Sequence, residues 1–322
     1  MTTFLLCFVL FCTPHVLSCH VMSCHAMSLL EGQICVDAIR TLHMNTMDTF
    51  EFTEESHTRN EVNQLLTECE QMLTGVKMIQ ELSPKSLDQL VSYGERCCVR
   101  IMAARLNQLG VPAQSFESWD IGIHTDSNFG DAKLLPSYEA SVQKAFNNRI
   151  DPETVAVVTG FIGHDPNGKI TTLGRGGSDL TATAIGAALR LDEIQVWKDV
   201  DGILSTDPRV VPHDRVVALD QVSFEEASEL AYFGAQVLHP IAMQPAQKYN
   251  VPVRVKNSYN PSAVGTIIRE EKSPMQRLVS TSVVCVCVCV YNNTVQYNAI
   301  IASSILLFRD FGSLSRSLII YY

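Results

Sequence analysis

Short apolar segments of strand length alternate with helical segments along the middle of this chain, and this alternation limits the folds open to it. Val155 to Thr159 reads Val-Ala-Val-Val-Thr, the pattern of a strand buried on both faces. Helical spacing of apolar residues starts after Ser83 and Pro84, a cap followed by proline, and ends at Gly110. Such alternation predicts an α/β domain with a mostly parallel sheet covered on both faces. The other predicted elements are strands at 169–173, 194–197 and 251–255, a helix at 178–191, and a helix from a Ser223/Glu226 capping box towards residue 233.

Composition excludes several classes of protein. The 322 residues suffice for one large domain plus an appendage, and the net charge of −10 argues against binding a nucleic acid. No apolar run reaches the 18 or so residues of a membrane-spanning helix, so we expect no membrane span. Of the 11 cysteines, those in the body of the chain fall in helical patterns and are expected to be reduced, packed thiols. They are Cys69, Cys97 and Cys98.

The two ends differ in character from the middle. Residues 1–35 contain no lysine or arginine, so a secretory or transit signal is not supported, and we expect a disordered arm. Val284 to Val290 alternates valine and cysteine, a strand-like pattern, within a tail of residues 271–322 that we treat as separate. The organised domain is therefore predicted to span residues 36–270.

One segment carries most of the chemical information. Thr171 to Asp179 reads Thr-Thr-Leu-Gly-Arg-Gly-Gly-Ser-Asp, a strand that ends in glycines and opens directly into a helix. Glycines let the backbone approach a ligand, and the N–H groups at a helix start attract anions. Arg175 adds a planar fork suited to a carboxylate, and Asp179 can hold a cation or orient an amine. The alternative is that Ser178 and Asp179 only cap the helix.

This segment resembles the signature of aspartate kinases, which have the amino-acid kinase (carbamate kinase-like) fold, and further blocks follow in that family's order. Over about 235 residues, the amino-acid sequence most resembles plant single-function aspartate kinases. The resemblance implies a three-layer αβα sandwich with a mostly parallel sheet. The matching blocks are Val91–Arg96, Leu173–Asp179, Val196–Leu204, Thr206–Arg209, Phe233–Pro240 and Val253–Asn257.

The resemblance also implies a reaction, namely transfer of the γ-phosphoryl group of ATP to the side-chain carboxylate of L-aspartate. This is the first step of lysine, threonine and methionine biosynthesis. Arg175 would bind a substrate carboxylate, Glu95 would face the substrate ammonium group, and Asp179 would organise the active-site lysine and the substrate. Mg²⁺ would bridge the phosphates, without an assigned protein ligand. The implied substrate-binding residues are Glu95, Arg175, Gly176, Gly177, Ser178 and Asp179, and the implied ATP-binding residues are Lys198, Asp199, Leu204, Arg209, Gln236 and Val237.

These residues have plainer interpretations as well. Lys198 and Arg209 are also explained as solvated loop charges, and Asp199 as a turn former. Glu95 could serve a structural ion pair. His239, which precedes Pro240, is read as a helix-entry residue rather than a catalyst.

One family element has no counterpart in the sequence. The family opens with a strand and turn of the form Lys-Phe-Gly-Gly-Ser, and nothing in residues 1–35 resembles it. We therefore expect the first strand to be missing, which puts the activity of this chain in question, and ACT domains are not expected after about residue 280. The alternatives are a non-catalytic fragment that binds nucleotide or pairs with intact subunits, or another amino-acid kinase of the glutamate or acetylglutamate type. By resemblance the location would be the chloroplast stroma, otherwise the cytosol, and a homodimer is allowed.

Overall fold

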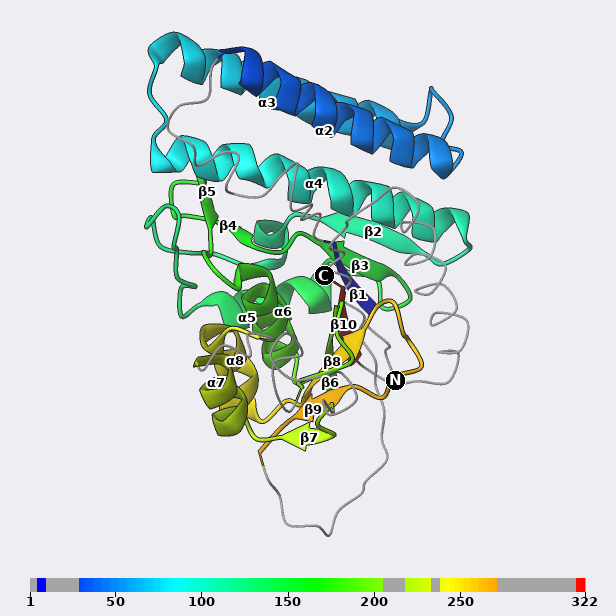
Figure 1. Ribbon diagram of the computed structural model, residues 1–322, viewed down its shortest axis with the longest axis vertical. Coiled ribbons are helices and arrows are strands. Elements are labelled where there is room, and N and C mark those ends of the chain that lie inside the picture. The colour runs from blue at the N-terminus through cyan, green and yellow to red at the C-terminus, as the bar shows by residue number, and fades with distance from the viewer. Residues whose placement is uncertain (1–4, 10–28, 205–217, 233–237, 271–316, 322) are drawn as a thin grey trace.

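The computed structural model describes residues 5–9, 29–204, 218–232, 238–270 and 317–321. Within these residues, three long helices follow one another after β1, and a mixture of strands and helices follows from β2 onwards (Figure 1). None of the helices in the described part of the chain is both long and apolar enough to cross a bilayer. The helices are α2 (Leu29–Thr49), α3 (His57–Ile79), α4 (Pro84–Gln108), the 3₁₀ turn η1 (Ser118–Ile121), α5 (Tyr138–Asn148), α6 (Gly177–Ala188), α7 (Phe224–Tyr232) and α8 (Pro240–Tyr249).

The strands form one large sheet and one small hairpin. In the described residues the large sheet has eight strands in the order β2-β3-β1-β10-β6-β8-β9-β7, and only β8 and β9 pair antiparallel. β4 and β5 form the separate antiparallel hairpin. The strands are β1 (Leu5–Val9), β2 (Ala113–Phe116), β3 (Val155–Val158), β4 (Ile162–His164), β5 (Ile170–Thr172), β6 (Glu193–Lys198), β7 (Gln221–Val222), β8 (Val253–Asn257), β9 (Thr266–Ile268) and β10 (Ser317–Tyr321).

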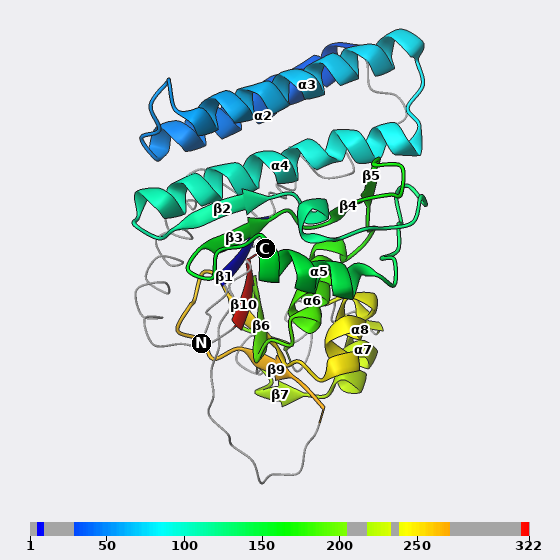
Figure 2. The ribbon, with the colours of Figure 1, turned by 180° about the vertical axis from the view of Figure 1, so that it is seen from behind.

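The sheet has a buried core on each face. Alternate side chains of a strand point to opposite faces, and β3 shows the consequence. Val155 and Val157 belong to the core formed with α2, α3 and α4. Ala156 and Val158 belong to the core formed with α5, α6, α7 and α8. The predicted three-layer arrangement with a mostly parallel sheet is therefore confirmed, and α2 and α3 add a further pair of helices outside α4 (Figure 2).

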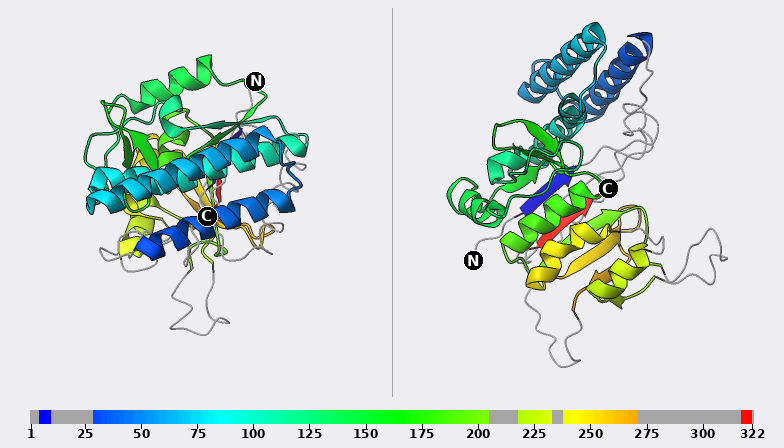
Figure 3. Two further views of the ribbon diagram at one scale, coloured as in Figure 1. Left: turned by 90° about the horizontal axis from the view of Figure 1, so that it is seen from above. Right: turned by 90° about the vertical axis from the view of Figure 1, so that its left-hand side faces the viewer.

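The terminal segments differ from the expectation of a missing strand and separate ends. β1 pairs with β3 on one side and with β10 on the other, so two short terminal strands occupy the middle of the sheet (Figure 3). β10 in turn pairs with β6 in parallel register. Apolar segments such as Leu-Leu-Cys-Phe-Val suit this doubly covered position. The region 1–35 was also predicted to be an arm, whereas α2 already begins at Leu29.

Several local predictions agree closely with the structure. The side chain of Ser83 accepts a hydrogen bond from the backbone N–H of Ser86 at 3.1 Å and caps α4. Ser223 and Glu226 exchange the two hydrogen bonds of a capping box, at 2.7 and 3.0 Å. His239 is the N-cap of α8, as the helix-entry reading predicted. The starts of α4, α7 and α8 are therefore fixed by local sequence signals.

Candidate active site

The glycine-rich turn between β5 and α6 is tightly packed on both sides. Gly174 and Gly176 have left-handed backbone angles, with φ of 66° and 73°. A Cβ atom at Gly176 would lie 2.6 Å from the Cβ of His239, and one at Gly174 would lie 2.6 Å from Oδ1 of Asp131. Only glycine meets both the angle and the space. The turn is thus held between the loop that carries Asp131 and the start of α8.

Two side chains on this turn face different environments. Arg175, between the two left-handed glycines, is exposed. Ser178 is buried in the first turn of α6, which begins at Gly177. The positive end of a helix dipole lies at this turn and favours a bound anion. The glycine turn and the helix start therefore lie where the sequence indicated, and substrate binding at this turn stays a prediction.

Asp179 and Lys198 form an ion pair beside this turn. Asp179 lies in the first turn of α6 and Lys198 ends β6, and Nζ of the lysine is 3.5 Å from Oδ2 of the aspartate. Burial raises the pKa of Asp179 to about 6, although the nearby ammonium group acts in the opposite direction. Burial also lowers the pKa of Lys198, against the attraction of Asp179. Oδ1 of Asp179 is buried and has no hydrogen-bond partner in the described part of the chain.

Glu95 reaches the same region from α4. It is 6% exposed, and burial raises its pKa well above the ordinary value, while a hydrogen bond from the N–H of Gly160 opposes that rise. Its Oε2 has no partner among the residues that the structure describes. Phe161, which follows Gly160, packs against the turn. A Cβ atom added at Gly177 would lie 2.9 Å from Cδ2 of Phe161. Glu95 and the turn are therefore joined through the two residues 160 and 161.

The loop after β6 is anchored along the edge of β8. The carbonyl oxygen of Lys198 accepts hydrogen bonds from the N–H and hydroxyl of Ser258, at 2.7 and 2.9 Å. Asp199 is exposed, and Leu204 is half-buried and bridges to residue 218. The predicted ATP residues Arg209, Gln236 and Val237 lie outside the described residues.

Comparisons with known proteins identify the family of this chain. The model of the amino acid kinase family matches residues 35–257. The chain belongs to the amino acid kinase family. Aspartokinase 1, chloroplastic, from Arabidopsis thaliana is 48% identical over 221 residues, which cover 68% of this chain and 38% of that protein. Aspartokinase 3, chloroplastic, from the same plant is 44% identical, over 75% of this chain and 45% of that protein.

A solved aspartokinase structure is also similar to this amino acid kinase. E. coli aspartokinase III in complex with aspartate and ADP has a TM-score of 0.73 and 30% sequence identity. That match covers 84% of this chain and 59% of the E. coli chain. The chain spans less than half the length of the two Arabidopsis relatives.

A buried carboxylate in this amino acid kinase, Asp88, was missed by the sequence analysis. Asp88 is 1% exposed and lies in α4 seven residues before Glu95. It accepts hydrogen bonds from the N–H of Gly130, the N–H of Thr172 and the hydroxyl of Thr172, at 2.9, 2.9 and 2.8 Å. Burial nevertheless raises its pKa. A signal existed in the spacing, because residues seven apart on a helix share one face.

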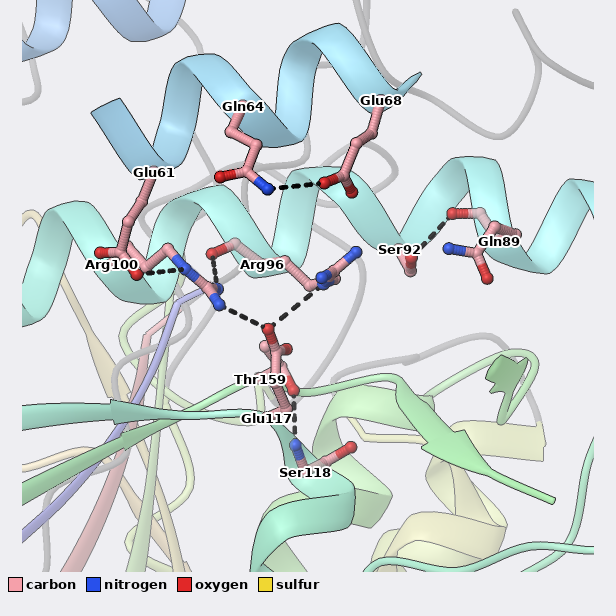
Figure 4. A network of polar contacts seen from close by, with 10 residues as sticks. All are labelled: Glu61, Gln64, Glu68, Gln89, Ser92, Arg96, Arg100, Glu117, Ser118 and Thr159. Atoms are coloured by element: carbon pink, nitrogen blue, oxygen red, sulfur yellow. Dashed lines mark hydrogen bonds and ion pairs between the residues drawn. The ribbon is translucent and has the colours of Figure 1, made fainter. Parts of the chain in front are cut away.

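A second missed carboxylate is Glu117, between β2 and η1. Its Oε1 accepts hydrogen bonds from Arg96 and Arg100 of α4, at 3.2 and 2.9 Å (Figure 4). The next residue, Ser118, donates its N–H to the hydroxyl of Thr159 at 2.8 Å. Because Thr159 precedes Gly160, this network supports the segment that contacts Glu95. An acidic residue between a short strand and a 3₁₀ turn gives no sequence signal of this role.

Proposed function

We propose that this chain is the catalytic part of an aspartate kinase, which transfers the γ-phosphoryl group of ATP to the side-chain carboxylate of L-aspartate. The observation that carries the proposal is the Asp179–Lys198 pair beside the Arg-Gly-Gly-Ser turn, with Glu95 joined to that turn through Gly160 and Phe161. The similarity to aspartokinase III in complex with aspartate and ADP supports it. Such transfers depend on positioning and on neutralising charge.

Each site residue has a defined part in the proposed reaction. Arg175 is exposed on the turn and binds a substrate carboxylate as a bidentate donor. Glu95, with one unpartnered oxygen, receives the substrate ammonium group, and that cation favours the ionised form of Glu95. Lys198 places a positive charge near the transferred group, and Asp179 keeps the lysine protonated and in place.

The proposed site would bind the nucleotide together with Mg²⁺. Mg²⁺ is usually held by substrate phosphates, waters and one or two carboxylates, and bound there it neutralises charge on the phosphates. Asp179 fits a carboxylate contact of this kind, because its Oδ1 is buried without a partner among the described residues. The loop that begins with Asp199 is the proposed nucleotide side of the site.

A second candidate function is nucleotide binding without turnover. The first lysine of the chain is Lys77, so the central strand β1 (Leu5–Val9) and the residues around it contribute no lysine. Loss of one contact that stabilises a transition state typically lowers the rate on the order of 10²- to 10³-fold. This chain would then bind nucleotide and pair with an intact subunit.

We also propose a chloroplast location, because both Arabidopsis relatives are chloroplastic.

A hydroxamate assay with the purified chain separates these functions. ATP-dependent formation of aspartyl hydroxamate, at least tenfold above an Asp179→Asn control, supports the kinase. ATP binding by calorimetry without any product supports the second function and rejects the first. Faster reaction with L-glutamate or N-acetyl-L-glutamate than with L-aspartate would assign the chain to another amino-acid kinase.

A further inference from the structure

Helix α4 carries two buried carboxylates on one face, and each holds a different loop of the proposed substrate site. Asp88 and Glu95 are seven residues apart, two helical turns, so both side chains point to the same side of the helix. Glu95 accepts the N–H of Gly160, which follows β3. Asp88 accepts from Thr172, the last residue of β5. Figure 1 shows the β4–β5 hairpin beneath the amino-terminal end of α4.

The contacts of Asp88 fix the start of the Arg175 turn. One oxygen accepts both the N–H of Thr172 and the N–H of Gly130, and the other accepts the Thr172 hydroxyl. The carbonyl oxygen of Thr172 in turn accepts the N–H of Ala132 at 2.8 Å. The strand and the 130–132 loop are thus tied to each other and to α4. Two residues later, Gly174 packs against this same loop.

We propose that Asp88 is a positioning residue that sets the separation between the carboxylate-binding Arg175 and the ammonium-binding Glu95. Those two groups sit on separate segments, the turn after β5 and the helix α4, and Asp88 joins the two segments directly. A substrate that contacts both groups needs them at a fixed separation. Asp88 therefore contributes to the affinity of the site for L-aspartate, an inference that rests on the proposed function.

The chain offers a conservative variant and a matched control for this role. Asp88→Leu keeps the branched shape but removes every acceptor, which leaves buried N–H groups without partners. Asp88→Asn keeps one oxygen for the two N–H donors and an amide that can donate to the Thr172 hydroxyl. Asp165 is 4% exposed and accepts from Lys169, Asn167 and Ser127 at the other end of the hairpin. Asp165→Leu therefore removes a comparable buried set of bonds away from the turn.

Hydrogen exchange of the full-length chain tests the positioning without any substrate. We expect amides 173–177 to exchange at least tenfold faster in Asp88→Leu, and within about threefold of wild type in Asp88→Asn and Asp165→Leu. Thr172→Val, which removes the hydroxyl bond alone, should give a smaller increase in the same direction, and Thr172→Ser should restore protection. If Asp88→Leu fails to fold, the comparison of Thr172→Val with Thr172→Ser decides whether Asp88 holds the turn. Equal exchange at the turn in the Thr172→Val and wild-type proteins would overturn the proposal.

Calorimetric titration with L-aspartate tests the effect on binding. We expect the dissociation constant to rise at least fivefold in Asp88→Leu, to rise by a smaller factor in Thr172→Val, and to stay unchanged in Asp88→Asn and Asp165→Leu. An equal loss of affinity in Asp88→Leu and Asp165→Leu would show a merely structural role and overturn the inference. A wild-type chain that does not bind L-aspartate rejects the proposed function, while hydrogen exchange still decides whether Asp88 holds the turn.

Discussion

The ammonium group of Lys198 lies 3.5 Å from the carboxylate of Asp179, and this contact joins the end of β6 to the first turn of α6. Both groups are removed from water, so each would prefer to be neutral if it were alone. Their mutual attraction favours the charged pair instead. The protonation of one group therefore depends on the presence of the other.

Replacement of Lys198 should raise the pKa of Asp179. In the wild-type chain this carboxyl has a pKa of about 6, raised by burial and restrained by the ammonium group. Lys198→Met removes the restraint, so the pKa of Asp179 should move above 6. Carbon-13 NMR of labelled aspartate carboxyls, followed over pH, measures the change. The Asp165 resonance is the internal control, because backbone N–H groups hold its pKa below the ordinary value at a separate place. A fall in the Asp179 midpoint would contradict the assigned ion pair.

Glu95→Gln should stabilise the empty protein while weakening its binding of L-aspartate. Burial raises the pKa of Glu95, so the folded state binds this proton more tightly than the unfolded state does. Its contribution to stability is complete below about pH 4.3 and is lost as the pH rises through the folded pKa. Glutamine removes the buried charge, and we expect a gain of about 1–3 kcal/mol in the free energy of unfolding at pH 8. Urea denaturation at pH 5 and pH 8 measures it.

The same substitution should remove the counter-charge of the substrate ammonium group. A hydrogen bond to a charged group contributes about 1.5–3 kcal/mol, so affinity for L-aspartate should fall roughly ten- to a hundredfold. Glu225→Gln, on an exposed position of α7, is the control for both measurements. Unchanged affinity in Glu95→Gln would place the ammonium group elsewhere.

Local sequence signals predicted the elements of this fold better than its long-range pairings. The capping hydrogen bonds of Ser83, the Ser223/Glu226 box and His239 join residues fewer than four positions apart. Their roles are therefore visible in the sequence. Asp88 is different, because its partners lie 42 and 84 positions away. Whether a carboxylate is buried and bonded there depends on the tertiary fold.

The middle of the sheet shows the same limit. β1 and β10 come from opposite ends of the chain and pair with each other. The apolar pattern of each segment predicts a strand, but periodicity does not identify its neighbour. The candidate site was more predictable, since the turn, Asp179 and Lys198 are close in sequence and share one β-turn-α-β unit.

Gly176→Ala should destabilise the protein far more than Gly168→Ala does, although both glycines are left-handed. Their φ angles are 73° and 69°, so alanine meets a similar backbone penalty of about 1 kcal/mol at each position. At Gly176 the new methyl would also lie 2.6 Å from the Cβ of His239, whereas nothing lies within 4 Å at Gly168. We expect a loss of about 3 kcal/mol for Gly176→Ala, with overpacking as the difference. Thermal and urea unfolding compare the two, and equal losses would show that the turn does not pack against α8.

Glu117→Gln should cost more stability than Glu70→Gln, because the two ion pairs differ in burial. Glu117 accepts from both Arg96 and Arg100, and its side chain is only 10% exposed. Loss of its charge removes the shared carboxylate from two partly buried guanidinium groups and leaves Arg100 with the more distant Glu61, at 3.8 Å. We expect a loss of roughly 2–3 kcal/mol. Glu70 pairs with Arg40 at 3.2 Å with 37% of its side chain exposed, so its loss should stay below about 1 kcal/mol. Urea unfolding of both variants at low and high salt distinguishes them, since only the exposed pair should respond to screening. Equal losses in the two variants would mean that the Glu117 network does not support the segment that contacts Glu95.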